Sequence, residues 1–117
     1  MFSLYYSKEK NRIYISIKDT LSASEFESYK AHIMQLIDDA EPGFTVLADL
    51  SHSDRSVIEK SDNFNVIREY GAERGFRANA LVLGEEAFKY FNSNAKGGNK
   101  NVFLTKEHAD TYLNKIS

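Results

Sequence analysis

The chain has 117 residues, with 15 Lys and Arg against 17 Asp and Glu, so its formal net charge is −2 at pH 7 with neutral histidines. This length suits one domain of roughly 100–150 residues, which can bury a core without a disulfide or a metal. The sequence contains no cysteine, which excludes disulfides, thiol nucleophiles and cysteine-based metal centres. The near-neutral charge argues against a dedicated nucleic-acid-binding protein, because such proteins carry a basic surface.

The sequence shows neither a membrane segment nor an export signal. No stretch approaches the ~18–20 consecutive apolar residues that a membrane-spanning helix needs. The first residues, MFSLYYSKEKN, lack the basic start and the long apolar core of a secretory signal peptide. With the absence of cysteine, this predicts a cytoplasmic protein without a membrane span.

Two alternating segments open the chain. Residues 2–7 alternate loosely, and residues 12–18 alternate well, with a polar turn between them. The isoleucines of the second segment share one side: Ile13, Ile15 and Ile17. Period two is typical of half-buried strands, so we predict an antiparallel hairpin. Tyr5 and Tyr14 fall on the opposite side; if that side is uncovered, they mark an interface and make a homodimer plausible, because tyrosine tolerates a partly wet surface.

The period then changes to that of a helix. Ser22 and Glu25 stand three residues apart, as in a capping box that opens a helix. Apolar residues follow at spacings of three and four until Pro42 and Gly43. The sequence therefore predicts an amphipathic helix between the capping box and this stop.

Strands and helices alternate from there to the end. We expect a strand over 44–50, a helix that runs to about residue 74 before Gly75, a strand over 78–83, a helix over 85–94, a strand over 101–104 and a last helix capped by Thr105. Such alternation implies parallel strands joined by right-handed crossovers. The predicted fold class is α/β: residues 1–117 form a single domain with a mixed β-sheet, an N-terminal antiparallel hairpin and βα crossover units.

Three short motifs accompany this order of elements. Residues 46–51 read VLADLS, Asp54-Arg55-Ser56-Val57 follows, and residues 102–109 read VFLTKEHA. Motifs and order resemble the STAS/SpoIIAA-like domain family, which is related to anti-sigma factor antagonists, over nearly the whole chain. Phosphorylated members have Asp, then Ser or Thr, then Ser and Gly at the second motif; here Arg55 stands at the phosphoacceptor position and Val57 replaces the glycine. The resemblance implies a divergent, bacterial-type regulatory or protein-interaction module without the usual serine phosphoswitch.

The polar segment after the predicted central strand is the candidate site. It contains Ser51, Ser53, Asp54, Arg55 and Ser56, with the last three as first candidates. Open α/β sheets place ligands at the carboxyl ends of their strands, and free N–H groups at a helix start attract anions. Arg55 can add a bidentate donor. The simpler alternative is that Ser53 or Asp54 only caps the next helix.

Catalytic and metal-binding patterns are absent from the sequence. Ser51, His52 and Asp54 are neighbours in the chain, whereas a Ser-His-Asp triad is recognised by its spatial geometry. The histidines are far apart and lack metal-site spacing: His32, His52 and His108. The glycines of Lys96-Gly97-Gly98-Asn99-Lys100 do not form a phosphate-binding loop. We therefore expect no enzyme, no cofactor and no metal.

A second function stays open beside the regulatory one. Aromatic residues at core spacing can also line an apolar pocket. Some SpoIIAA-like proteins resemble lipid-binding SEC14-type folds, so the alternative is a carrier or sensor of a small apolar or amphiphilic ligand. An uncharacterised enzyme is the third reading.

Overall fold

The N-terminal segments form the predicted antiparallel hairpin. In a computed structural model of the chain, β1 (Phe2–Ser7) pairs with β2 (Arg12–Asp19) so that Phe2 lies opposite Ile17 and Ser7 opposite Arg12. Asn11, in the turn between them, has a positive φ of 51°, which a short polar side chain tolerates. The structure describes residues 1–54, 56–57, 65–94 and 101–116.

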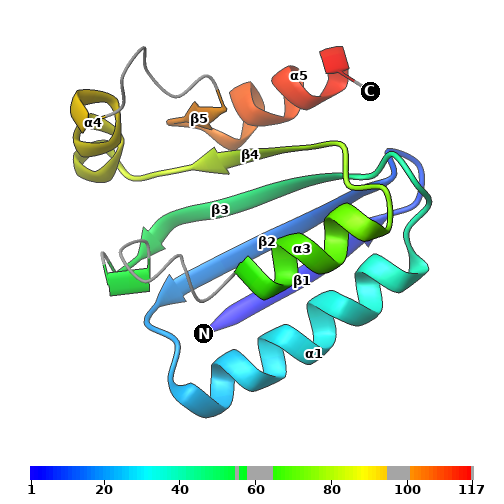
Figure 1. Ribbon diagram of the computed structural model, residues 1–117. Helices are drawn as coiled ribbons and strands as arrows, with labels where there is room; N and C mark the ends of the chain where they lie inside the picture. Colours follow the sequence, from blue (N-terminus) through cyan, green and yellow to red (C-terminus); the bar gives the residue numbers. More distant parts are fainter. Residues whose placement is uncertain (55, 58–64, 95–100, 117) are drawn as a thin grey trace.

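Three parallel strands extend this hairpin into one mixed sheet (Figure 1). They are β3 (Thr45–Ser53), β4 (Ala78–Val82) and β5 (Val102–Phe103). The strands lie in sequence order from β1 to β5, and only β1 and β2 are antiparallel. The predicted α/β class and single mixed-sheet domain are confirmed.

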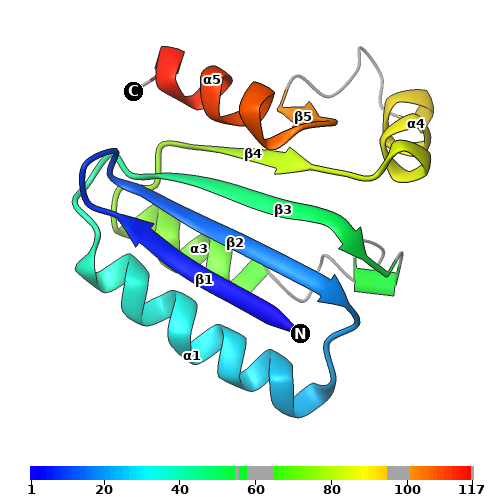
Figure 2. The same cartoon turned by 180° about the vertical axis from the view of Figure 1, so that it is seen from behind.

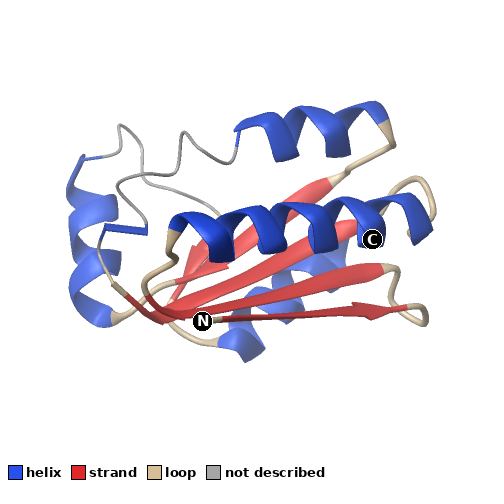
Figure 3. Cartoon of the chain, turned by 90° about the horizontal axis from the view of Figure 1, so that it is seen from below, coloured by secondary structure: helices blue, strands red, loops and turns tan. Residues whose placement is uncertain are grey.

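The helices cover the two faces of the sheet unequally. They are α1 (Ala23–Asp39), α3 (Asn65–Glu73), α4 (Glu85–Asn94) and α5 (Lys106–Ile116). Helices α1 and α3 lie on one face and α5 on the other, while α4 stands at the end of the sheet (Figures 1 and 3). None of the described helices combines the length and the apolar character that crossing a membrane requires.

Each face has its own apolar core. On the side of α1 and α3, the isoleucines of β2 pack against Tyr29, Ile33 and Ile37 of α1. On the other side, Ala109 and Leu113 of α5 pack on the sheet. The buried partners from the strands are Leu47, Ala80 and Val82. Because successive side chains of β3 and β4 point to opposite faces of the sheet, these strands contribute residues to both cores.

A buried arginine ties α5 to the sheet. Arg12 is 0% exposed, and its Nε donates to Thr45 Oγ1 at 2.9 Å. Its Nη1 donates to Asp110 Oδ1 and, at 3.0 Å, to Asn114 Oδ1, both on α5. A buried charge is tolerated only when it is paired and hydrogen-bonded, so this cluster sets where α5 docks.

The capping box at α1 is confirmed. Ser22 Oγ accepts a bond from Glu25 N, and Glu25 Oε1 accepts one from Ser22 N, both at 3.2 Å. The N-terminal ammonium lies 3.0 Å from Glu25 Oε2. Hydrogen bonds from the N-terminus and from Ser22 lower the pKa of the Glu25 carboxyl.

Ser22→Ala is expected to lower the free energy of unfolding by about 1 kcal/mol, because it removes the acceptor for an N-terminal N–H of α1. Ser28→Ala, at an exposed position within the same helix, is the matched control. It should be neutral or slightly stabilising, since alanine has the higher helix propensity. Urea unfolding followed by circular dichroism measures both, and equal losses in the two variants would contradict the capping role.

The central strand is longer than predicted. β3 continues to Ser53, beyond the predicted end at Leu50, and β5 is shorter than predicted. The cause is the length of β2, whose last residues pair with this extension: Lys18 lies opposite His52 and Asp19 opposite Ser53. Ser51 and Ser53 therefore belong to a strand, and the polar loop begins only at Asp54.

Candidate functional site

Ser51 and Ser53 of the predicted site make hydrogen bonds to residues close to them in the chain. Ser51 Oγ donates to Asp49 Oδ1 at 2.6 Å, and the same oxygen accepts a bond from Ser51 N at 3.0 Å. Ser53 Oγ donates to the carbonyl oxygen of Leu50 at 2.8 Å. Both hydroxyls therefore take part in local contacts at the end of β3.

Asp54 organises the turn after the strand. Its N–H donates to the carbonyl oxygen of Asp19 at 2.6 Å, and its Oδ1 accepts a bond from Ser56 N at 2.8 Å. Hydrogen bonds from Ser56 lower the pKa of the exposed Asp54 carboxyl. Arg55 lies outside the described residues. The contacts of Asp54 match those of a capping residue, and partner binding by this loop stays a prediction.

An apolar cavity lies between the sheet and the pair α1 and α3. Its volume is about 240 Å³. Strands β2, β3 and β4 line it from one side, and Ile33, Ile37 and Ile67 line it from the helices. Val57, which follows Ser56 in the chain, is buried and lines it as well. An apolar cavity of roughly 150 Å³ is known to admit benzene, so this one has room for a larger molecule.

Strands β3 and β4 form part of the cavity wall. Val46, Ala48 and Leu50 alternate toward it along β3, and Leu81 faces it from β4. These four side chains are only half-buried. α3 itself packs closely, because a Cβ at Gly71 would already lie 3.6 Å from Phe44 Cζ. These strand side chains therefore stay partly accessible at the cavity.

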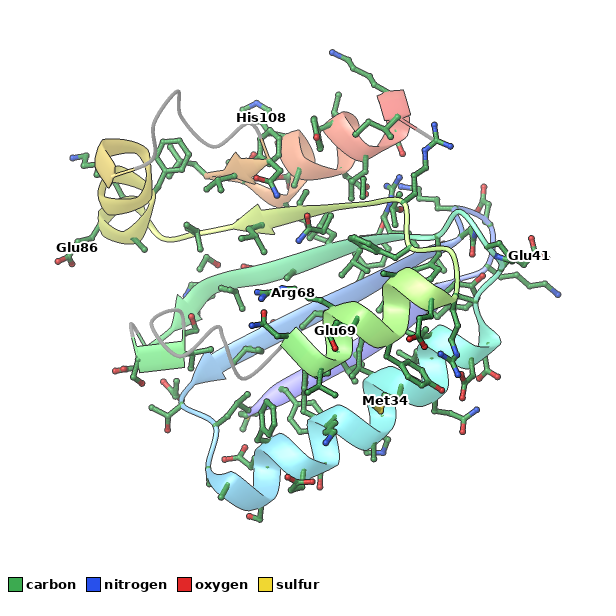
Figure 4. The ribbon with its side chains drawn as sticks, viewed as in Figure 1. Met34, Glu41, Arg68, Glu69, Glu86 and His108 are labelled. Atoms are coloured by element: carbon green, nitrogen blue, oxygen red, sulfur yellow. The ribbon has the colours of Figure 1, made fainter. Side chains whose placement is uncertain are left out.

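Few polar groups reach the cavity. Arg68 of α3 lines it but is an exposed residue, so its guanidinium belongs to the rim; Figure 4 shows this side chain extending from α3 across the strands. Arg68 Nη1 donates to Asn65 Oδ1 at 2.6 Å. Burial raises the pKa of the Tyr29 hydroxyl, and the positive charge of Arg68 opposes that rise. Among the described residues, the site thus combines mainly apolar walls with Asn79 and the cationic Arg68.

The part of the chain that the structure describes contains no cluster of metal-binding side chains. No three His, Cys, Asp or Glu side chains of that part come together as a metal would require. His32 packs beside Phe2, with ring centroids 6.1 Å apart. His108 points away from the sheet on the exposed side of α5 (Figure 4).

The residues that line the cavity were only partly anticipated. Among the aromatic residues, Tyr29 lines the cavity, whereas Tyr5 and Tyr14 lie on the opposite face of the sheet, as the alternation of the hairpin predicts. The sequence signal that indicates the cavity wall is the alternation of apolar residues along β3. Val46, Ala48 and Leu50 are two residues apart, so their side chains lie on the same face of the strand.

The chain was compared with protein families, curated proteins and solved structures. No family model matches the chain, and neither a curated protein nor a solved structure matches it.

Proposed function

We propose that the protein binds a small, largely apolar molecule in the cavity between the sheet and helices α1 and α3. The observation that carries the proposal is the cavity of about 240 Å³ with walls from isoleucine, leucine, valine and alanine. Ligand sites are typically apolar, with a few polar groups that set orientation. Arg68 at the rim supplies such a group, which favours an amphiphile with an anionic end.

The volume bounds the ligand. At about 30 Å³ for each water-sized group, a 240 Å³ cavity holds roughly eight groups of the size of a methylene. Each buried methylene contributes about 0.8 kcal/mol before the cost of association is subtracted. A chain or ring system of about eight carbons is therefore the expected size. Its burial contributes about 6 kcal/mol before the cost of association, so the expected affinity is in the millimolar range.

Val57 connects the proposed ligand site with the predicted partner-binding loop, which suggests a regulatory role. Val57 lines the cavity, and the preceding Ser56 belongs to the loop predicted to contact a protein partner. A ligand in the cavity would touch the residue next to that loop and so bias its conformation. We therefore propose a non-enzymatic, ligand-responsive interaction module, in keeping with the resemblance to SpoIIAA-like regulators. The absence of cysteine supports a cytoplasmic setting.

Filling the cavity is expected to abolish binding. Ala48→Phe places a phenyl ring inside the cavity. It should weaken the binding of octanoate at least tenfold, as measured by isothermal titration calorimetry or by NMR titration. Ala72→Phe makes the same change at an exposed position of α3 and should leave binding intact. Binding that survives Ala48→Phe, or that is lost equally in Ala72→Phe, would place the ligand elsewhere.

The head group is tested separately with Arg68→Gln. This variant should weaken octanoate severalfold and leave 1-octanol unchanged, because only the carboxylate interacts with the guanidinium charge. Equal effects on the two probes would remove Arg68 from the site. If neither probe binds the unmodified protein and native mass spectrometry finds no co-purified molecule, the ligand-binding proposal fails.

A further inference from the structure

The face of the sheet opposite the cavity is only half covered. Helix α5 packs on β3 and β4 through Ala109 and Leu113, and no described helix lies over β1 and β2 on this face (Figure 2). The open strands and the flank of α5 enclose a groove of about 430 Å³. Polar and apolar side chains both line this groove, in contrast to the mainly apolar cavity behind it.

Two tyrosines form an aromatic shelf in the groove. Tyr5 and Tyr14 are directly opposite in the β1–β2 pairing, and their rings lie 6.0 Å apart at an interplanar angle of 32°. Tyr5 is 62% exposed. Ser3 and Ser16 are also paired across the two strands and add hydroxyls to the same floor. The floor is thus a rigid sheet surface that presents apolar ring faces and hydroxyl groups side by side.

The wall of the groove carries both positive and negative side chains. Lys106 Nζ lies 5.0 Å from the centroid of the Tyr14 ring. Asp110 accepts bonds from Lys10 Nζ at 2.9 Å and from the Tyr14 hydroxyl at 2.8 Å, in addition to that from Arg12. Lys10 and Arg12 therefore neutralise Asp110, while Lys106 lies over the Tyr14 ring as a further cation. Asp49 adds a carboxylate acceptor, one oxygen of which is used by Ser51.

We propose that this groove binds an acidic sugar, a hydroxyl-bearing ring with a carboxylate or phosphate. The C–H face of such a ring is apolar and packs on an aromatic shelf, as Tyr5 and Tyr14 provide. Its hydroxyls need both donors and acceptors, which serine hydroxyls and Asp49 supply. Its anionic group matches the ammonium of Lys106. This site lies on the other face of the sheet from the cavity, so it does not depend on the ligand proposed there.

The test is an NMR titration of the full chain with sodium glucuronate and, in parallel, with neutral glucose. Glucuronate should give saturable shifts at Tyr5 and Tyr14 with a Kd of about 1 mM, as expected for an open site, and should bind several times more tightly than glucose. Lys106→Ala should remove the preference for glucuronate, and Tyr5→Ala should weaken both sugars at least fivefold. Lys115→Ala, an exposed lysine of the same helix outside the groove, should change neither.

Three results would overturn the proposal. The first is the absence of saturable shifts in the millimolar range. The second is a response to glucuronate that equal concentrations of sodium chloride reproduce, which indicates charge screening alone. The third is a concentration-dependent dimer in analytical ultracentrifugation that Tyr5→Ala disrupts, because the groove is then the contact between two copies of the chain.

Discussion

Asp110→Ala is expected to lower the free energy of unfolding by about 3–5 kcal/mol, because it removes the carboxylate that is paired with the buried guanidinium of Arg12. The side chain of Arg12 is only 1% exposed, whereas that of Asp110 is 23% exposed. The loss thus comes mainly from the weaker pairing of the buried guanidinium, and less from the partly exposed carboxylate itself. Urea unfolding followed by far-ultraviolet circular dichroism measures it.

Lys10→Ala is the control for that prediction. It removes the exposed partner of the same carboxylate, so the expected loss is below about 1 kcal/mol. Similar losses for Lys10→Ala and Asp110→Ala would show that surface charge, and not the buried Arg12, dominates the cluster.

The Asp110 contribution also depends on pH. Burial alone would raise the pKa of Asp110, but hydrogen bonds from Lys10, Tyr14 and Arg12 outweigh it and lower the pKa below the ordinary value of 3.8. The charged form is therefore favoured in the folded state, and its stabilisation is present above pH 3.8 and lost as the pH falls through the lower folded pKa. The difference in stability between the unmodified protein and Asp110→Ala should narrow below that pH. A constant difference down to acid unfolding would contradict the linkage.

Of the two glycines with positive φ in the described part of the chain, Gly75 is expected to be the more sensitive to substitution by alanine. Gly75 has a φ of +93°, and an added Cβ would lie 2.8 Å from the Cα of Pro42, which is backbone and cannot turn away. Gly43 has a φ of +89°, but an added Cβ there would meet no atom within 4 Å. Gly43→Ala thus isolates the conformational cost, about 1–2 kcal/mol, and Gly75→Ala should cost about 1–3 kcal/mol more.

The hydrogen bond between these glycines makes the comparison informative. Gly43 N donates to the carbonyl oxygen of Gly75 at 2.7 Å, so the chain before β3 and the end of α3 are held together at this point. Thermal and urea unfolding of both variants test the prediction. Equal losses would mean that the backbone at Pro42 moves aside without measurable cost.

Local interactions explain which elements could be predicted. The Ser22–Glu25 capping box lies within four residues of chain, and α1 begins at Ala23, directly after Ser22. The isoleucines of β2 alternate with period two, and they are buried on one face. The predicted end of the central strand was wrong because Ser51 to Ser53 are polar, and their strand geometry comes from pairing with Lys18 and Asp19. That pairing is a contact between distant segments, which no local pattern contains.

The sequence by itself determined the α/β class, the hairpin, the order of elements and the helix caps, since periodicity and capping act over a few residues. Only the tertiary structure decided the sites. Arg12 reads as an ordinary polar strand residue until α5 brings Asp110, 98 positions later in the chain, against it. The apolar alternation of β3 reads as core, and only the packing of α1 and α3 against the sheet shows that part of it lines a cavity. Cavities and buried ion pairs depend on how separate elements meet, and that geometry is decided by packing rather than by local sequence.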